Sequence, residues 1–234
     1  MNKKKAPNRV LKTFLAMTLS ASMILGGVAV ADVFYPTEDN VARAATTSSS
    51  LGSTTAAGLT KISVGDTITF STSASGSYGK MKAKCISSSN DNLLFQSYGL
   101  THGAWPGTNG KSGTPASNIN SYDNYTQALV NELGNALSGA LYLPTGTSTS
   151  DIQGGANVYN VLVEAAKQYS SFGAAYNNAW LGSPCGSGSA YFVNSNGNVY
   201  SYGTGYDYVL APAFNLKASY AWKIGSTFVK NVGG

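Results

Sequence analysis

The sequence predicts an α+β domain with a mostly antiparallel, twisted sheet, two helices and long loops. Three observations indicate this fold class. Alternating apolar residues near the start of the domain are typical of strands, two stretches with an apolar residue about every four positions are typical of helices, and an Asn-Gly hairpin signal follows. Strands, two helices and strands again argue for an α+β arrangement. The 27 glycines disfavour a coiled coil or helical bundle.

The first strands are expected at the start of the domain. Residues 61–70 carry alternating apolar side chains around a Gly-Asp turn: Ile62, Val64, Ile68 and Phe70. Residues 81–86 and 93–96 are expected as the next two strands, separated by a turn-rich stretch. Residues 101–120 are rich in Gly, Ser, Thr and Asn, and we expect a long loop there around Trp105.

Two helices with core-facing stripes are expected in the middle of the chain. The first spans residues 122–141, with Ser121 or Asp123 as its N-cap, and the second spans about 157–169. The stripes consist of Tyr125, Leu129, Leu133, Leu137 and Leu141 in the first helix, and of Val158, Leu162, Ala165 and Tyr169 in the second.

Strands are expected again in the C-terminal third. Residues 190–194 and 199–202 flank a Ser-Asn-Gly-Asn sequence, whose Asn-Gly pair favours the positive backbone angles of a type I′ turn. Residues 208–216 and 221–229 are expected to supply further strands.

The N-terminus has the pattern of a secretory signal. A basic start is followed by an apolar run and by two small-x-small cleavage sites, one after Ala31 and one after Ala44. An uncleaved membrane anchor is the alternative, because the apolar run approaches the length of about 20 residues that spans a bilayer.

The resulting organisation has three parts. Residues 1–44 are interpreted as the signal peptide, 45–58 as a flexible Ser/Thr-rich spacer and 59–234 as a single domain. We expect a secreted or extracellular protein, and association with the cell surface is one form that this localisation can take. After the signal is removed, no stable insertion into the membrane is expected.

The net charge of +5 belongs mainly to the predicted signal. Cleavage after Ala31 would leave ten basic and ten acidic side chains, and cleavage after Ala44 would leave nine and seven. Because the mature chain is nearly neutral, its charge does not favour nucleic acid as a partner.

One block of the sequence carries a family resemblance. It comprises Trp180-Leu181-Gly182-Ser183-Pro184, Ala190-Tyr191-Phe192-Val193, Gly197-Asn198-Val199 and Ala211-Pro212-Ala213-Phe214-Asn215-Leu216. This block resembles an uncharacterised domain family of secreted and surface proteins of Gram-positive bacteria. Members carry W-L-R-S-P, an A-x-x-V strand with a G-x-V hairpin, and V-R-P-A-L-N-L; the sequence V-G-D-T-I-T-F at 64–70 also fits.

The resemblance implies a fold similar to C-type-lectin-like domains, including formylglycine-generating-enzyme-like and bacterial adhesin versions. The residues expected to carry this architecture are Trp180, Ser183, Pro184, Gly197, Pro212 and Asn215. Both characteristic arginines are missing, because Gly182 and Ala211 stand in their places. Formylglycine-generating enzymes rely on paired cysteines, and Cys185 has no such neighbour in the sequence.

Recognisable catalytic motifs are absent from the sequence. The single histidine, His102, lies in a Gly/Ser-rich stretch without a G-x-S-x-G elbow, and no zinc-ligand spacing is present, so we expect no metal and no cofactor. A carboxylate pair brought together by folding would have to come from a few central acids. These are Asp123, Glu132, Asp151, Glu164 and Asp207, for which helix caps and solvated faces are the favoured interpretation.

Cys85 and Cys185 form an even pair in a chain with an export signal. A disulfide between them is the preferred interpretation, because such bridges are typical of exported proteins. Two free thiols and intermolecular pairing are the alternatives.

The remaining signal is aromatic and amide-rich. Tyrosine and tryptophan faces stack on sugar rings, and asparagine side chains offer donors and acceptors to hydroxyl groups. The candidate ligand-binding residues are Trp105, Asn194, Tyr202, Tyr206 and Tyr208. The alternative interpretation is that these rings cover a sheet and pack against the helices.

The main functional hypothesis is an exported, non-enzymatic domain that binds or adheres to a cell-surface glycan or protein. The second hypothesis is a secreted hydrolase that acts on cell-wall or host polymers through a carboxylate pair. A purely structural surface component is the third.

Overall fold

The computed structural model describes residues 58–74, 79–107, 114–168, 177–186 and 188–231. The predicted signal peptide, both of its cleavage sites and nearly all of the predicted spacer lie outside the described residues. Among the described residues, no helix is long and apolar enough to cross a membrane.

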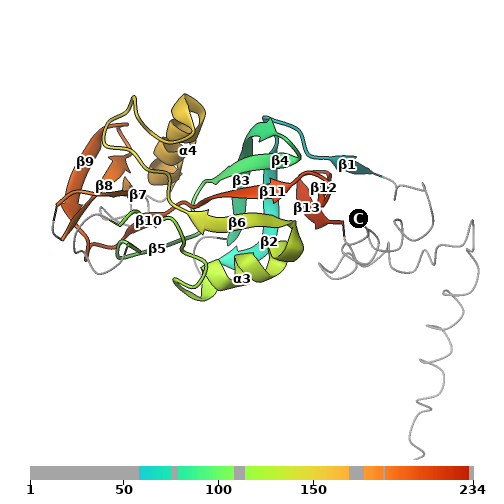
Figure 1. Cartoon of the computed structure of the whole chain (residues 1–234), viewed down its shortest axis with the longest axis horizontal. Coiled ribbons are helices and arrows are strands. Elements are labelled where there is room, and N and C mark those ends of the chain that lie inside the picture. The colour runs from blue at the N-terminus through green and yellow to red at the C-terminus, as the bar shows by residue number, and fades with distance from the viewer. Residues whose placement is uncertain (1–57, 75–78, 108–113, 169–176, 187, 232–234) are drawn as a thin grey trace, which may run out of the picture.

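The described strands form two sheets, on either side of helix α4 (Figure 1). The large sheet has the order β1-β12-β13-β2-β3-β4-β11-β6, and the small sheet has the order β5-β10-β7-β8-β9. The large-sheet strands are β1 (Leu59–Lys61), β2 (Thr67–Ala74), β3 (Gly79–Ser89), β4 (Asn92–Ser97), β6 (Leu137–Tyr142), β11 (Ala213–Lys217), β12 (Ala221–Ile224) and β13 (Thr227–Lys230). The small-sheet strands are β5 (Thr101–Gly103), β7 (Asn178–Pro184), β8 (Ser189–Asn194), β9 (Val199–Gly203) and β10 (Tyr208–Leu210).

Nearly all strand pairs are antiparallel. The parallel pairs in the described sheets are β13 with β2 and β10 with β7. The α+β prediction with mostly antiparallel pairing is therefore confirmed, with two sheets in place of the one expected.

Helix α3 (Asn124–Leu133) is shorter than predicted. Of the two candidate N-caps, Asp123 is the one that caps the helix, because its carboxylate accepts from the Thr126 amide at 2.8 Å. The helix ends at Gly134, which has a φ of 51°, and after the 3-10 turn η3 (Gly134–Ala136) the chain becomes strand β6. The prediction of helix through residue 141 is wrong because the same apolar spacing also fits a strand, from which Leu141 enters the core.

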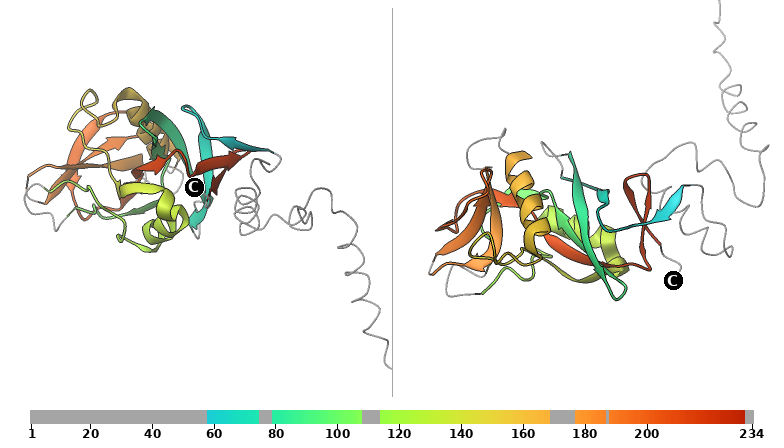
Figure 2. Two further views of the ribbon diagram at one scale, coloured as in Figure 1. Left: turned by 45° about the vertical axis from the view of Figure 1, so that its right-hand side comes forward. Right: turned by 90° about the horizontal axis from the view of Figure 1, so that it is seen from above.

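Helix α4 (Gly155–Gln168) confirms the second predicted helix. It lies between the two sheets and contacts β3 and β4 on one side and β7 and β8 on the other (Figure 2). Its stripe residues Val158, Leu162 and Ala165 are buried in a cluster with Ile86 and Val193, so α4 joins the sheets through apolar contact.

The hairpin between β8 and β9 is confirmed, but its predicted turn type is wrong. Gly197 has a φ of 83°, whereas Asn196 has a negative φ, and a type I′ turn requires positive φ at both central residues. The backbone bond from the Gly197 amide to the Asn194 carbonyl closes a longer loop instead. The two-residue connection with positive φ at both positions is Asn90-Asp91, between β3 and β4.

Pro212 separates two strands that were predicted as one. The chain leaves the small sheet after β10 and enters the large sheet at β11, with Ala211 and Pro212 between them. A proline cannot donate to a strand ladder, but its carbonyl can accept, and here it accepts from the Ser97 amide at 3.0 Å.

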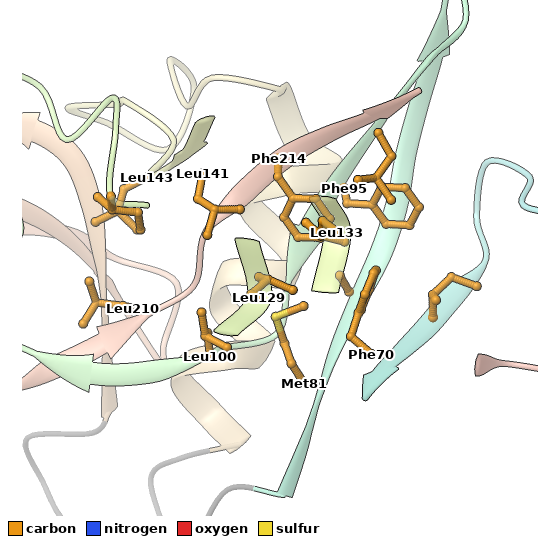
Figure 3. Packing of buried hydrophobic residues seen from close by; sticks show 14 of the residues in the cluster. Phe70, Met81, Phe95, Leu100, Leu129, Leu133, Leu141, Leu143, Leu210 and Phe214 are labelled. Atoms are coloured by element: carbon orange, nitrogen blue, oxygen red, sulfur yellow. The ribbon is translucent and has the colours of Figure 1, made fainter. Parts of the chain in front are cut away.

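The main core lies between the large sheet and α3 and extends to the small sheet. The rings of Phe95 and Phe214 stack with their centroids 5.5 Å apart, and Phe70 meets Phe214 edge-on at 5.6 Å. Leu129 and Leu133 of α3 close the cluster from the other side (Figure 3). This packing fixes the strands from which the candidate site is built.

Candidate binding surface

A chain of aromatic rings runs from the core to the surface of the small sheet. The Trp180 ring lies 4.4 Å from the Tyr208 ring, Tyr208 lies 6.0 Å from Tyr206, and Tyr206 lies 4.5 Å from Tyr202. Trp180 is fully buried, whereas Tyr202 and Tyr206 are 49% and 48% exposed. The three exposed tyrosines, Tyr200, Tyr202 and Tyr206, are called the tyrosine surface below.

Strand alternation produces the tyrosine surface. On β9, Tyr200 and Tyr202 point to the same side of the sheet, because successive side chains on a strand alternate. Tyr200 is paired in register with Phe192, and the two ring centroids are 6.1 Å apart. Tyr206 follows in the turn before β10, and its hydroxyl donates to the Tyr202 hydroxyl at 3.5 Å, which raises the pKa of Tyr206. The exposed rings are therefore held by their neighbours.

Trp105 is buried and does not belong to this surface. It is 6% exposed, and its indole Nε1 donates to the Leu181 carbonyl at 2.7 Å. The prediction that Trp105 binds a ligand is therefore corrected. Trp105 is a core residue, and its indole N–H already donates to the Leu181 carbonyl of β7.

Tyr208 is likewise buried, with 6% of its surface exposed. It lies on β10, which is flanked by β5 and β7 in the small sheet. The Tyr208 ring packs between Trp180 and Phe192. The prediction that Tyr208 contacts a ligand directly is therefore corrected. Tyr208 instead packs beneath Tyr206 and supports that ring.

Asn194 organises the hairpin between β8 and β9. Its side-chain oxygen accepts from the amides of Asn196 and Asn198 at 3.0 and 2.8 Å. Asn194 pairs with Asn178 at the end of β8 where β9 begins, whereas Tyr202 lies near the other end of β9. The structure therefore does not bring Asn194 together with Tyr202 and Tyr206.

His102 and Asp207 form a pair beside the tyrosine surface. The His102 Nδ1 atom lies 2.6 Å from Asp207 Oδ1, and the two side chains are 32% and 47% exposed. His102, expected in a loop, lies on strand β5, and its contact with Asp207, 105 residues away, has no local signal in the sequence. The pairing follows from β5 and β10, which are antiparallel neighbours.

Tyr122 links this pair to the start of α3. Its hydroxyl donates to the Ala104 carbonyl at 2.7 Å. Partial burial raises the pKa of Tyr122, and the nearby charges of Asp123 and Asp207 raise it further. Asp207 therefore contributes negative charge to the region around β5 and the tyrosine surface.

Each of the five candidate acids has its own partner. Asp123 caps α3, and Glu132 accepts from the amide and hydroxyl of Ser71. Asp151 accepts from Thr147 and Ser148, Glu164 pairs with Lys167 at 3.0 Å, and Asp207 binds His102. Within the residues that the structure describes, no group of three or more His, Cys, Asp or Glu side chains could hold a metal ion.

The motif residues are distributed over strands β7 to β11. Trp180 donates through Nε1 to the Gly103 carbonyl, and the Ser183 hydroxyl accepts from the Gly146 amide at 2.9 Å. Pro184 ends β7, Gly197 makes the hairpin, Pro212 joins the sheets, and Asn215 lies on β11. These residues hold backbone segments together.

Gly182 and Ala211, which stand at the two arginine positions of the pattern described above, lie in tightly packed surroundings. A Cβ atom on Gly182 would collide with the Leu143 carbonyl oxygen, because the Gly182 backbone bonds to Pro144 and Ala116 on the neighbouring segments. Ala211 is fully buried against α4. Neither position has room for an arginine side chain.

The two cysteines lie in different environments, and both thiols are free in the structure. Cys85 is fully buried in the main core, and burial raises the pKa of its thiol to about 11. Cys185 follows β7 and is partly exposed; hydrogen bonds with the Ser201 and Tyr191 side chains lower the pKa of its thiol. The predicted disulfide is not present in this structure and stays a prediction for the oxidised protein.

No family model, curated protein or solved structure matches this chain.

Proposed function

We propose that this protein is an exported binding module whose tyrosine surface contacts a glycan on a cell surface. The observation that carries the proposal is a set of three exposed rings held from below: Tyr202 and Tyr206 rest on buried Tyr208, and Tyr200 rests on buried Phe192. Exposed aromatic rings with polar tips suit a ligand that has both apolar ring faces and hydroxyl groups.

Preorganisation supports the proposal. Binding costs less conformational entropy when the contacting side chains are already held in place. Tyr202 and Tyr206 contact each other, and Tyr206 also contacts the buried Tyr208, so two exposed rings are restrained before any ligand arrives. Asp207 beside them would accept hydrogen bonds from sugar hydroxyls.

A glycan is preferred to a protein ligand because of the composition of the surface. Protein interfaces typically centre on a fully buried apolar core with aromatic and arginine anchors. The tyrosine surface is a narrow strip of hydroxyl-bearing rings on β9 and the following turn, next to the His102–Asp207 pair. The faces of these rings can pack on the apolar faces of sugar rings, and their hydroxyl groups can form hydrogen bonds with sugar hydroxyls.

Binding is also preferred to hydrolysis. A glycoside hydrolase needs two carboxyl groups facing one bond at separations of roughly 5 to 9.5 Å. The contacts of the five candidate acids are local and serve caps, turns and ion pairs on different elements. Asp207 is the acid next to the tyrosine surface, and its contact there is with His102.

The same proposal includes a C-type-lectin-like architecture. It is supported by the α+β organisation, by the two helices and by the mostly antiparallel strand pairing. The fit at Gly182 and Ala211 accounts for the arginines that the family pattern has and this chain lacks.

A glycan array and a whole-cell pull-down test the binding function. The purified protein should retain a limited set of glycans, and Tyr202→Ala combined with Tyr206→Ala should abolish that retention. Tyr220→Ala is the matched control, because Tyr220 is a partly buried tyrosine in the turn before β12. Absence of binding by the parent protein in both assays would remove the proposal.

A further inference from the structure

Strand β9 forms one end of the small sheet (Figure 1). It pairs with β8 on one side, and on its other side no described strand pairs with it. None of its five residues is buried. A strand at the end of a sheet offers unpaired backbone donors and acceptors to a further strand. The unpaired side of β9 is called the open edge below.

Backbone hydrogen bonds at both ends of the hairpin indicate which residues face the open edge. The Asn194 amide donates to the Asn198 carbonyl at 2.9 Å, and the Thr204 amide donates to the Gly188 carbonyl at 2.9 Å. Hydrogen-bonded and non-hydrogen-bonded pairs alternate along an antiparallel ladder, so the even-numbered residues of β9 bond to β8. The backbone groups of Ser201, at the centre of β9, therefore point to the open edge.

The backbone groups at the open edge are available for pairing. Within the part of the chain that the structure describes, the amide and carbonyl groups of Val199 and Ser201 form no hydrogen bond. The Gly203 carbonyl accepts from the Tyr206 amide at 3.3 Å, and a carbonyl oxygen can accept a second bond. The Ser201 hydroxyl bonds to the Cys185 side chain, which leaves the Ser201 backbone free.

The other ends of the two described sheets are protected, whereas β9 is not. Native proteins protect edge strands by making them short, by placing charges on them or by covering them with another segment. Strands β1 and β5 are three residues long and carry Lys61 and His102. At β6, the Leu141 carbonyl accepts from the Ile119 amide, so a neighbouring segment covers that edge. Strand β9 is longer than β1 and β5, and residues 168–206 contain no charged side chain.

The sequence of β9 is nearly symmetric about its central residue. It reads Val199-Tyr200-Ser201-Tyr202-Gly203. Two antiparallel copies with Ser201 opposite Ser201 would place Tyr200 of each copy opposite Tyr202 of the other. Val199 of each copy would then lie opposite Gly203, which has no side chain to obstruct it. A two-fold interface requires such a self-complementary patch.

We propose that β9 pairs with β9 of a second copy of this chain, antiparallel and in the register centred on Ser201. The two Ser201 residues exchange a reciprocal pair of backbone hydrogen bonds, and the two small sheets become one continuous sheet. Cross-strand pairs of Tyr200 with Tyr202 add aromatic contacts on one face. Because β9 carries no charge, the paired strands do not repel each other.

A second copy fits this edge better than an unrelated extended peptide. Any peptide strand could use the backbone groups of the open edge. Only a copy of β9 repeats the spacing of Tyr200 and Tyr202 about Ser201, so that both tyrosine pairs and the central backbone bonds form in one register. Pairing also uses up the open edge of each copy, and association should therefore stop at two.

Pairing would bring two tyrosine surfaces together. Tyr200 and Tyr202 lie on a face of the sheet and not at its edge, so they stay accessible in the pair. The two-fold axis of an antiparallel strand pair is perpendicular to the sheet, which puts both tyrosine surfaces on the same face. Bivalent glycan binding is a consequence that rests on the proposed function, whereas the pairing itself does not.

The pairing is tested without any glycan, by sedimentation equilibrium of the full chain from micromolar to near-millimolar concentration. The parent protein should change from one copy to two as its concentration rises. Ser201→Pro removes the central outward amide, and it should weaken the dimer at least tenfold. The bonds between β8 and β9 do not use this amide, so the hairpin remains. Ser201→Ala is the matched control, because it loses the hydroxyl and keeps the backbone groups, and it should dimerise as the parent does.

A second pair of variants tests the register itself. Ser201→Lys and Ser201→Asp each place like charges opposite one another at the two-fold axis, so each protein alone should be a monomer. An equimolar mixture should dimerise at least tenfold more tightly than either variant alone, because lysine then faces aspartate. Recovery in the mixture also shows that both variants are folded.

Three results would overturn the proposal. The first is a parent protein that is monomeric over the whole range or that assembles beyond two copies. The second is a Ser201→Pro variant with the folded denaturation midpoint of Ser201→Ala that dimerises as tightly as the parent. The third is a mixture of the lysine and aspartate variants that associates no better than each variant alone.

Discussion

The imidazole of His102 and the carboxylate of Asp207 lie 2.6 Å apart, and this contact fixes the turn that carries Tyr206 against strand β5. Asp207 immediately follows Tyr206 and precedes Tyr208, the first residue of β10. The contact between His102 and Asp207 therefore helps to hold the backbone next to the exposed Tyr206 ring. Its role in binding can be separated from its role in stability.

Asp207→Ala should weaken ligand binding more than it weakens the fold. Both side chains of the pair are about a third exposed or more, so solvent screening limits the loss in unfolding free energy to about 1 kcal/mol. The affinity for the glycan should fall about tenfold, because Asp207 positions Tyr206 and accepts from sugar hydroxyls. Urea denaturation and glycan titration measure the two effects. Glu164→Ala breaks the exposed pair with Lys167 and should leave affinity unchanged; an equal affinity loss in both variants would contradict the assignment.

Gly182→Ala should destabilise the protein by about 2 kcal/mol or more, since the added methyl group collides with a backbone carbonyl that cannot move without breaking the bonds around it. Gly205→Ala is the matched control, because a Cβ atom there meets nothing within 4 Å. The control should change the unfolding free energy by less than about 0.5 kcal/mol. Urea denaturation of both variants checks the prediction, and similar stabilities would show that the close approach at Gly182 is not rigid.

The stability should fall as the pH is lowered from about 4 to 2, with a contribution from Asp151. Hydrogen bonds from the Thr147 hydroxyl and from the Ser148 and Thr147 amides lower the pKa of Asp151 from 3.8 to about 2. A carboxyl group with a lowered pKa in the folded state stabilises it above pH 3.8, and this stabilisation is lost as the pH falls through 2. Asp151→Asn should flatten the curve in that window. Denaturation midpoints between pH 5 and pH 2 measure the effect, and a curve unchanged by the substitution would exclude Asp151 as a source.

The two thiols should react at very different rates. Cys185 is partly exposed and its thiol pKa is lowered, whereas Cys85 is fully buried and its thiol pKa is raised to about 11. Without reductant, the native protein should therefore show one fast thiol, which Cys185→Ser removes, and a second that appears only on unfolding. If neither thiol reacts before reduction, even in denaturant, and the unreduced protein runs as a monomer on a denaturing gel, the predicted disulfide between Cys85 and Cys185 is present; a dimer on that gel indicates intermolecular pairing.

Much of the fold could be predicted from local patterns. Helix α4 and the hairpin of β8 and β9 followed from periodicity and from an Asn-Gly signal. The end of α3 could not be predicted in this way, because Leu137 and Leu141 continue the helical spacing while Gly134 ends the helix. Leucines at this spacing fit either element, and tertiary pairing of β6 with β11 decides between them.

The candidate site was predicted only in part. Tyr202 and Tyr206 could be selected because both are aromatic and close in sequence, and both are exposed. Trp105 could not be recognised as a core residue, because its burial depends on β7, whose Leu181 carbonyl lies 76 residues away. The contact between His102 and Asp207 likewise depends on a pairing between distant strands.

The central claim is that the tyrosine surface binds a glycan, and the most direct measurement is the dissociation constant of the best array ligand for the parent protein and for the Tyr202→Ala, Tyr206→Ala variant. Loss of two central aromatic contacts should weaken binding at least 100-fold, or about 3 kcal/mol, with an unchanged denaturation midpoint. Tyr220→Ala should keep the parent affinity. A double variant that binds as tightly as the parent would contradict the account.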